Sequence, residues 1–498
     1  METDSVKAVR NHRNKERREK AVIKAAEREV HMREVQIQIE PFAYIALQKL
    51  TISQRINQHG EAKVSMRIKD EWKEAYLGTL MKPTWVRIMG KGEEGGEGAT
   101  YTVLFNGLVT DFAFGQNGYE TILELQLNSG TILMDRQKHF RVFQNEEADC
   151  MKLYQGLTLA YPKGQVKAAE EKEEKTEGVL IQYQETDWQF LKRLASRTGR
   201  YLVPMNQRKG CGYTLGLPTG REREMETQRI RQQLNMGDYL TKQENGLASL
   251  SSSDMVELVL NSREIYQLGD RLSWQGKEYC IYQIETAYDG AECVHSYYLK
   301  TKAALQVVAA HHEGIGGASF SATITNVQKD KVQVEIEGDE WKSADGKKWF
   351  LYSTVYSSPD GTGWYCMPEI GDSVRLYVPE REEDSFILSA VHKETDASRQ
   401  NPDYKSFKTR YGKELLFTPD TILFTNNQGM LVEMNDSEGI SIISDKDVLI
   451  EAADKLTIAS EAGSLLVAAE EALQVKQGGT SMTLSEDISF TGGEFRIQ

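Results

Sequence analysis

The chain has 498 residues, of which 40% are apolar and 27% charged, and it carries a formal net charge of −14. That length allows about three or four domains, and the acidity argues against nucleic acid as the main partner, because phosphates would be repelled. The five cysteines are odd in number and show no CxxC spacing, so we expect neither a disulfide framework nor a zinc site.

The hydropathy of the chain gives no sign of export by the general route. No apolar run approaches ~18 residues, so we expect no transmembrane helix. The basic N-terminus lacks the apolar segment of a secretory signal. We therefore expect folding in the cytoplasm, and transport by another route if the protein acts outside the cell.

The first 34 residues form a mixed-charge segment with ten Lys or Arg and seven Asp or Glu. The segment holds no Gly or Pro, and its apolar residues recur at helical spacing from Ala21 to Val30. A solvated helix and an arm that docks on a neighbouring subunit both fit this pattern.

From about residue 35 the pattern changes to alternating, β-branched stretches that predict strands. The first five are at 35–40, 63–69, 84–89, 100–114 and 120–127. Residues 90–98 contain a formal GxGxxG, but a strand follows it and glutamates lie within it. We therefore expect a hairpin loop there and not a nucleotide site.

The next stretch mixes helices with strands. Residues 141–154 predict the start of a helix, and residues 178–203 predict strand, helix and strand. In the second region, Thr186 and Gln189 have the spacing of a capping box, and Trp188 lies on an apolar face that we expect in a core. Further strands are expected near 255–260, 271–284 and 294–302.

Residues 311–319, HHEGIGGAS, interrupt the strand pattern. A metal site of the HExxH type needs a second histidine, which this stretch lacks, so we expect a linker. Five strand candidates with Gly and Pro turns follow up to residue 392, and they predict a small closed barrel of the OB type. The acidic stretch 379–385 argues against nucleic-acid binding by this barrel.

The tail of the chain carries an internal repeat. From Leu415 onward, apolar pairs with one residue between their members recur, in the middle of the run every eight or nine residues. Each pair predicts a short strand, and such a repeat is typical of a solenoid. A single-chain β-helix and an intertwined trimer with one shared apolar axis would both bury the pairs, and the spacing leaves both open. The expected core pairs are Ile440/Ile442, Val448/Ile450, Leu456/Ile458 and Leu465/Val467.

Taken together, three stretches resemble VgrG-type spike proteins of contractile injection systems, in which a baseplate hub is fused to a tail spike. RVFQN (141–145) and ETDWQFLKRLASRTGRYL (185–202) resemble motifs of the hub half. MPEIGDSVRLYVPEREEDSFILSAVH (367–392) resembles the OB-fold of the family. The repeat tail resembles their trimeric needle, so the resemblance covers roughly residues 35–498 in the right order.

The resemblance implies a mainly β chain with tandem hub barrels and a few helices, an OB-fold barrel and a C-terminal trimeric β-helix. The Pro-x-Ile-Gly-Asp turn of the OB-fold contains Pro368, Gly371 and Asp372. We expect Gly371 to permit the turn dihedral and Asp372 to hydrogen-bond the turn backbone. The helical arm, hub, OB-fold, linker and needle are expected at 1–34, 35–310, 318–395, 396–412 and 413–498.

The implied function is that of a structural, non-enzymatic homotrimer. It would join the inner tube and baseplate to a needle that pierces the target envelope and supports effector delivery. Implied partners are a PAAR-like tip protein, effectors and a tape-measure protein, with transient contact with the target membrane and none with nucleic acid. The protein would assemble in the cytoplasm without a signal peptide and then act as part of an injection particle, outside the cell or in the target envelope.

We expect no cofactor and no metal. Some spikes of this family hold iron through histidines in the last coils, and no histidine follows His392 here. Some carry a lysozyme between OB-fold and needle, and residues 393–412 are too few for one. A peptidoglycan-degrading tail enzyme remains an alternative function, although no GxSxG, HExxH or Cys/His arrangement supports it. A single-chain solenoid adhesin is a second alternative, and it would be a monomer that needs an export signal.

Overall fold

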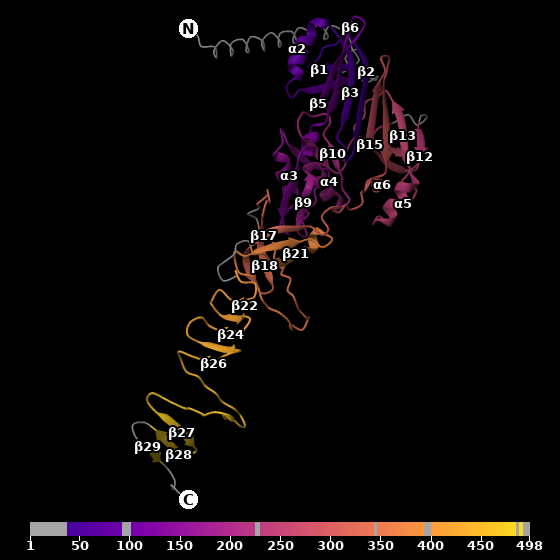
Figure 1. Cartoon of the computed structure of the whole chain (residues 1–498). Helices are drawn as coiled ribbons and strands as arrows, with labels where there is room; N and C mark the ends of the chain where they lie inside the picture. Colours follow the sequence, from indigo (N-terminus) through magenta and orange to yellow (C-terminus); the bar gives the residue numbers. More distant parts are fainter. Residues whose placement is uncertain are drawn as a thin grey trace, which may run out of the picture. The chain divides into compact units, whose positions relative to one another are not determined.

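Figure 1 shows the computed structural model of the chain, which describes residues 37–91, 101–224, 230–342, 346–392, 400–484 and 488–491. The chain divides into two compact units, residues 1–393 and 394–498. No helix in the described ranges is long and apolar enough to cross a membrane. The predicted arm at 1–34 lies outside the described residues, and so does most of the predicted loop at 90–98.

The fold is mainly β, as the sequence predicts. One antiparallel sheet dominates the first unit, with the strand order β1-β4-β5-β6-β3-β2-β15-β16-β13-β12 and with β14 paired to β15. The pairing of β2 with β15 joins segments far apart in the chain into one sheet. The strands are β1 (Ile37–Glu40), β2 (Ala46–Arg55), β3 (Glu61–Ile68), β4 (Trp85–Gly90), β5 (Thr102–Asn117), β6 (Glu120–Asn128), β12 (Ile230–Gln233), β13 (Glu257–Ser262), β14 (Arg271–Trp274), β15 (Lys277–Tyr288) and β16 (Cys293–Lys300).

Several elements of this region escape the sequence prediction, among them β2 and the helix α2 (Asp70–Leu80). A bulge between Leu47 and Lys49 breaks the alternation of β2, so the period-two signal is lost there. The helix buries Trp72, Ala75, Tyr76 and Leu80, a spacing that a search for helical periodicity could have found. Trp72, Tyr76 and Leu80 pack with strands β1–β6 in one hydrophobic core. The smaller helices α5 (Met236–Glu244) and α6 (Lys302–Leu305) lie near β12 and β16 in the chain.

Residues between Met134 and Leu215 supply a second hydrophobic core around Trp188, which is 1% exposed. The helix predicted from residue 141 begins only at Cys150, because residues 141–143 alternate in strand β7 and the Asp149 carboxylate accepts the Met151 N–H as a cap. The predicted strand, helix and strand are confirmed as β9, α4 and β10. The elements are η1 (Gly130–Asp135), β7 (Lys138–Phe143), α3 (Cys150–Leu159), β8 (Gln165–Ala168), β9 (Leu180–Thr186), α4 (Asp187–Ser196), β10 (Leu202–Pro204) and β11 (Gly212–Leu215).

A closed barrel of the OB type follows. Its antiparallel strands have the order β19-β18-β17-β20-β21, and a parallel bridge between Tyr352 and Ile387 connects the two ends of this order. The predicted strands are confirmed, although β19 is much shorter than the predicted 348–355. The elements are β17 (Ser319–Gln328), β18 (Lys331–Ile336), β19 (Phe350–Leu351), β20 (Ser373–Tyr377), η3 (Glu382–Asp384) and β21 (Phe386–Ala390).

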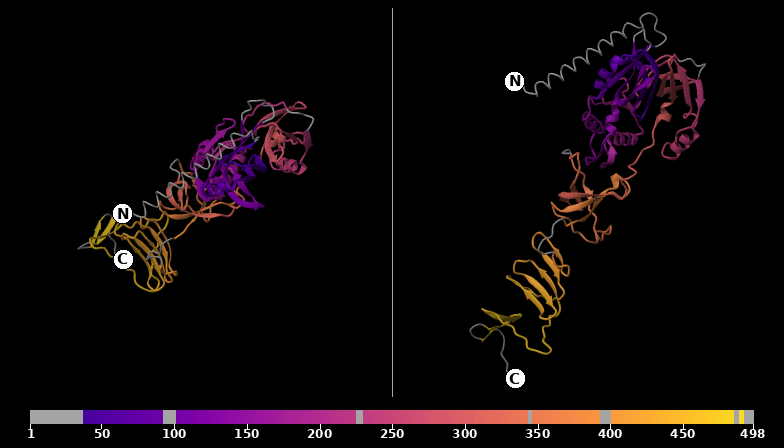
Figure 2. Two further views of the ribbon diagram at one scale, coloured as in Figure 1. Left: turned by 90° about the horizontal axis from the view of Figure 1, so that it is seen from above. Right: turned by 45° about the horizontal axis from the view of Figure 1, so that its top comes forward.

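The second unit contains two antiparallel sheets. Strands β22 to β26 pair in chain order and lie side by side in one layer (Figure 2). The first of them falls inside the predicted linker 396–412, and the domain boundaries stay a prediction. The strands are β22 (Lys405–Lys408), β23 (Glu414–Phe417), β24 (Thr421–Thr425), β25 (Leu431–Asn435), β26 (Gly439–Ile443), β27 (Leu473–Gln477), β28 (Thr480–Leu484) and β29 (Ile488–Thr491).

The repeat prediction is only partly met in this unit. The pair Ile440/Ile442 lies in β26, but residues 444–472 form no strand. A strand needs a hydrogen-bonded neighbour, and this stretch finds none among the described residues of its own chain. The strands of residues 405–443 pair as antiparallel hairpins, whereas a single-chain β-helix stacks parallel coils. The trimeric β-helix stays a prediction.

Candidate functional site: an apolar sheet face and a polar joint

The sheet of β22–β26 carries large apolar side chains on one face. Directly paired residues of neighbouring strands point to the same side of a sheet. The register therefore places large apolar side chains in two adjacent rows on one side of the sheet, which we call the apolar face. Its residues are Phe407, Leu415, Phe424, Val432 and Ile442 in one row and Phe417, Ile422, Met434 and Ile440 in the other.

The apolar face is open to solvent in this chain. Ile440 is 71% exposed, Ile442 59% and Phe424 51%. An open hollow of about 530 Å³ on this sheet is lined in part by one row of the apolar face, together with Val448 and with polar residues such as Lys413, Glu414 and Asp447. The opposite face is mixed, and one of its rows contains Lys408, Glu414, Thr425, Leu431 and Ile443. A contiguous apolar patch of this kind marks an interaction surface.

The apolar pairs predicted farther along the needle are exposed as well. Among the described residues, 444–472 make no backbone-to-backbone hydrogen bond. Their exposed fractions are 56% for Val448, 61% for Ile450, 54% for Leu456, 64% for Ile458, 57% for Leu465 and 60% for Val467. The structure thus leaves all eight predicted needle-core residues exposed in the single chain.

The predicted OB turn lies directly before β20. Gly371 has φ +97° and its N–H donates to the Ile324 carbonyl over 2.9 Å. The Asp372 carboxylate accepts the N–H of Glu369 over 2.8 Å, and the Asp372 carbonyl accepts the N–H of Ile324. Pro368 is half-buried just before this turn. The turn thus ties β17 to the start of β20, which is a structural task.

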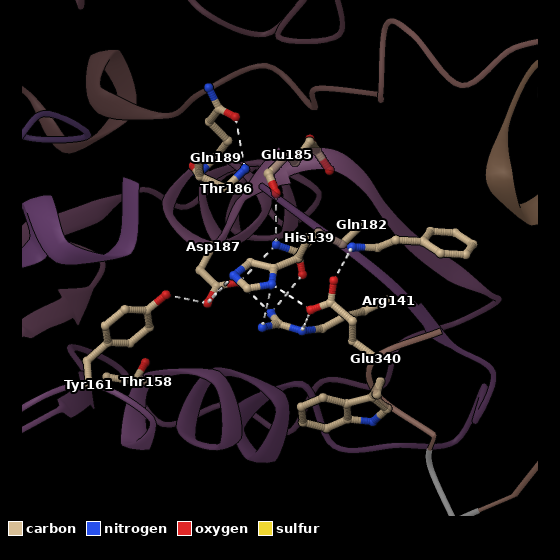
Figure 3. Close-up of polar contacts among 12 residues, drawn as sticks. His139, Arg141, Thr158, Tyr161, Gln182, Glu185, Thr186, Asp187, Gln189 and Glu340 are labelled. Carbon is tan, nitrogen blue, oxygen red and sulfur yellow. Dashed lines mark hydrogen bonds and ion pairs between the residues drawn. The ribbon is translucent and has the colours of Figure 1, made fainter. Parts of the chain in front are cut away.

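A cluster of charged side chains, which we call the polar joint, lies where β7, α4 and the barrel meet (Figure 3). Arg141 on β7 donates to Asp187 over 2.5 Å, and Tyr161 donates to the same carboxylate over 2.6 Å. His139 lies 2.6 Å from Glu340 of the barrel. Burial would raise the pKa of Glu340, but hydrogen bonds from His139 and from the Phe140 N–H outweigh it and lower the pKa. We did not predict a role for any of these residues from the sequence.

Two other clusters contain residue types that enzymes use. His59 lies 3.2 Å from Asp135 and 2.8 Å from Thr131, but the Thr131 hydroxyl is fully buried and no substrate can reach it. His295 lies 3.9 Å from the Cys293 thiol. Burial raises the pKa of Cys293 to about 11 and lowers that of His295 to about 4. Both groups are therefore neutral at pH 7, the reverse of an activated thiolate–imidazolium pair.

The histidines of the predicted linker also have structural surroundings. His312 lies 2.6 Å from the Tyr183 carbonyl and 3.8 Å from the Glu185 carboxylate. In the part of the chain that the structure describes, no group of three or more His, Cys, Asp or Glu side chains could hold a metal ion.

The comparisons with known proteins address the hub and the fold. Residues 54–209 match the family model of the phage tail baseplate hub. The Francisella PdpA–VgrG complex aligns with 80% of this chain in its lidded form, at 10% identity and a TM-score of 0.52, covering 76% of that chain. The half-lidded form gives 10% identity and a TM-score of 0.51 and covers 80% of this chain and 83% of that one.

The Escherichia coli c3393 protein, a type VI secretion component described as similar to T4 bacteriophage tail proteins, aligns at 11% identity and a TM-score of 0.49, over 72% of this chain and all of that one. No curated protein matches the sequence. The family match concerns the hub, and the VgrG likeness concerns the fold. Residues 54–209 thus match the phage tail baseplate hub family, and the fold of the chain is similar to that of VgrG.

Proposed function

We propose that this protein is the homotrimeric hub-spike of a contractile injection machine, and that it works mechanically and not as an enzyme. The hub would attach to the inner tube and baseplate, in keeping with the family match of residues 54–209. The second unit would be the needle that is driven through the target envelope. The observation that carries the proposal is the exposed apolar face of β22–β26.

The apolar face supports self-association because water is a poor environment for it. Burying each half-exposed aliphatic or aromatic side chain contributes roughly 1 kcal/mol. The full set is needed to offset the loss of freedom on association, which costs roughly 4–15 kcal/mol. Copies of the same chain carry the same rows at the same spacing, so their faces can pack around a common axis. A needle built in this way resists unravelling because many contacts must break together.

The remaining expectations belong to the same proposal. Residues 440–498 carry four Lys or Arg against ten Asp or Glu, and this charge would keep the rod soluble before firing. A separate PAAR-like protein would cap the tip, and effectors and a tape-measure protein would be further partners. Assembly would occur in the cytoplasm, and the particle would act outside the producing cell or in the target envelope. A peptidoglycan-degrading activity is disfavoured by the inaccessible Thr131 and by the neutral Cys293–His295 pair.

The test is the solution mass of the intact chain, measured by light scattering after size-exclusion chromatography. We expect a mass near three times the 56.4 kDa of one chain. Ile440→Asp should yield monomers, because a carboxylate cannot be buried without a partner. Ile443→Asp is the matched control, since Ile443 is 55% exposed on the same strand but on the opposite face.

Two results would contradict the proposal. One is an intact chain that stays monomeric at micromolar concentration. The other is an equal loss of mass in Ile440→Asp and Ile443→Asp, because the apolar face would then not be the contact. For the hub, electron microscopy of particles that contain the protein should place it at the junction of inner tube and baseplate.

A further inference from the structure

The barrel of the OB type shares its hydrophobic core with the hub. Val142 of β7, Val179 directly before β9 and Ile181 of β9 are 1%, 0% and 0% exposed. They belong to the same cluster as the barrel residues Val332, Val334, Leu376 and Ile387. Two rings extend this contact, since Phe140 stacks on Phe320 of β17 with ring centroids 4.9 Å apart. The two-stranded β7–β9 ribbon thus covers one side of the barrel core and contributes side chains to it.

Barrel carboxylates cap both free edges of this ribbon. Val142 and Ile181 are direct partners across the ribbon. Their N–H groups point away from each other and donate to barrel side chains: Val142 to Asp339 over 3.0 Å and Ile181 to Glu382 over 2.8 Å. The barrel loop adds a backbone bond, from the Glu340 N–H to the Phe140 carbonyl. A ribbon of two strands has two edges with unpaired backbone groups. Here hydrogen bonds with the barrel pair some of the groups on each edge.

A buried arginine closes the contact. Arg193 on α4 donates to Glu382 of η3 over 2.7 Å and to the Ile181 carbonyl over 2.9 Å. It also forms an ion pair with Glu185 over 2.8 Å. The side chains of Arg193 and Glu382 are only 7% and 6% exposed. Breaking a buried pair is costly because it leaves a buried charge poorly compensated. Without Arg193, Glu382 would keep only the longer ion pair with Arg197, over 3.8 Å.

We infer that the β7–β9 ribbon and the Arg193–Glu382 pair lock the hub and the barrel into one mechanical body, so that the barrel holds its fold only on the hub. Axial load then passes through the shared core and the buried pair. The linker around residues 306–318, which connects the hub to the barrel along the chain, does not have to bear this load. This lock goes beyond the proposed self-association, since it operates within one copy and involves no residue of the apolar face.

The test is hydrogen exchange of the full-length chain, followed peptide by peptide. In Arg193→Met, we expect protection of the barrel strands β17, β18 and β20 to fall about 100-fold. Protection of β3 and β6 in the distant hub core should stay unchanged. Arg263→Met is the control for the loss of a charge pair, because Arg263 and Glu292 form an ion pair with side chains that are 53% and 51% exposed. It should leave the barrel strands unaffected.

A second pair of variants tests the shared core. Ile181→Ala and Ile52→Ala remove the same atoms from side chains that are 0% and 1% exposed. Only Ile181→Ala should weaken the barrel strands, because Ile52 belongs to the separate core of β1–β6. Barrel protection that is untouched by both Arg193→Met and Ile181→Ala would overturn the lock, and so would an equal loss in barrel and distant hub. The solution mass of each variant keeps this outcome separate from a failure of self-association.

Discussion

Thr186 and Gln189 hold each other's backbone at the start of α4. The Thr186 hydroxyl accepts the N–H of Gln189 over 3.2 Å, and the side-chain Oε1 of Gln189 accepts the N–H of Thr186 over 3.0 Å. This capping box, predicted from spacing alone, is confirmed. It matters because α4 carries both Asp187 of the polar joint and Arg193 of the lock.

Removing this cap should destabilise the hub. We expect Thr186→Ala to lower the free energy of unfolding by about 1–2 kcal/mol, since it deprives the Gln189 N–H of its acceptor. Thr186→Ser keeps the hydroxyl and should cost much less. Urea denaturation followed by circular dichroism measures both values. Equal losses in the two variants would show that the methyl group, and not the hydroxyl, stabilises this site.

Trp188 should be among the most sensitive positions of the hub. The side chain is 1% exposed and lies edge-on to Tyr213, with ring centroids 5.9 Å apart. Trp188→Ala should therefore cost about 3–5 kcal/mol. Trp364→Ala is the matched control, because Trp364 is 58% exposed, and thermal unfolding should barely change. A small loss of stability in Trp188→Ala would show that neighbouring side chains move into the space that the indole leaves.

Protonation of His295 should make stability fall in mild acid. Burial lowers its pKa to about 4 in the folded chain, whereas the unfolded value is about 6.5. Above pH 6.5 both states are neutral. Between these two pKa values only the unfolded chain binds the proton, so unfolding becomes easier as the pH falls, by roughly 3 kcal/mol in all.

The measurement is the free energy of unfolding as a function of pH. His295→Gln should flatten the curve between pH 6.5 and about 4. His311→Gln replaces an exposed histidine and should leave the shape as it is. An unaltered slope in His295→Gln would show that other groups bind the proton.

The OB turn should depend on its glycine for backbone reasons only. Gly371 has φ +97°, and a Cβ there would meet no atom within 4 Å. Gly371→Ala should therefore cost about 1–2 kcal/mol from the strained dihedral, without any clash. Gly115→Ala, at an open strand position without a positive φ, should be neutral or slightly stabilising. A tolerant Gly371→Ala variant would mean that the turn can adopt another conformation.

Local signals were sufficient where neighbouring residues decide the structure. Thr186 and Gln189 lie within one helical turn. The alternation runs along most of 331–337 and as far as Ile324 in 319–328, before a bulge, so both features could be predicted. The bulge at Leu47 and Lys49 hid β2, since one extra residue inverts the pattern. The polar joint was missed because Arg141, Asp187 and Glu340 are far apart in the chain and each has an ordinary charged neighbourhood in sequence.

The amino-acid sequence by itself determined the mainly β fold class, the helix cap at Thr186 and the repeat of apolar pairs near Ile440. These features depend on the period of the side chains and on contacts within a few residues. Tertiary structure alone decided that Val142 and Ile181 complete the barrel core and that Arg193 meets Glu382. Those contacts join residues up to 201 positions apart, and their strength comes from burial, which only the folded chain creates.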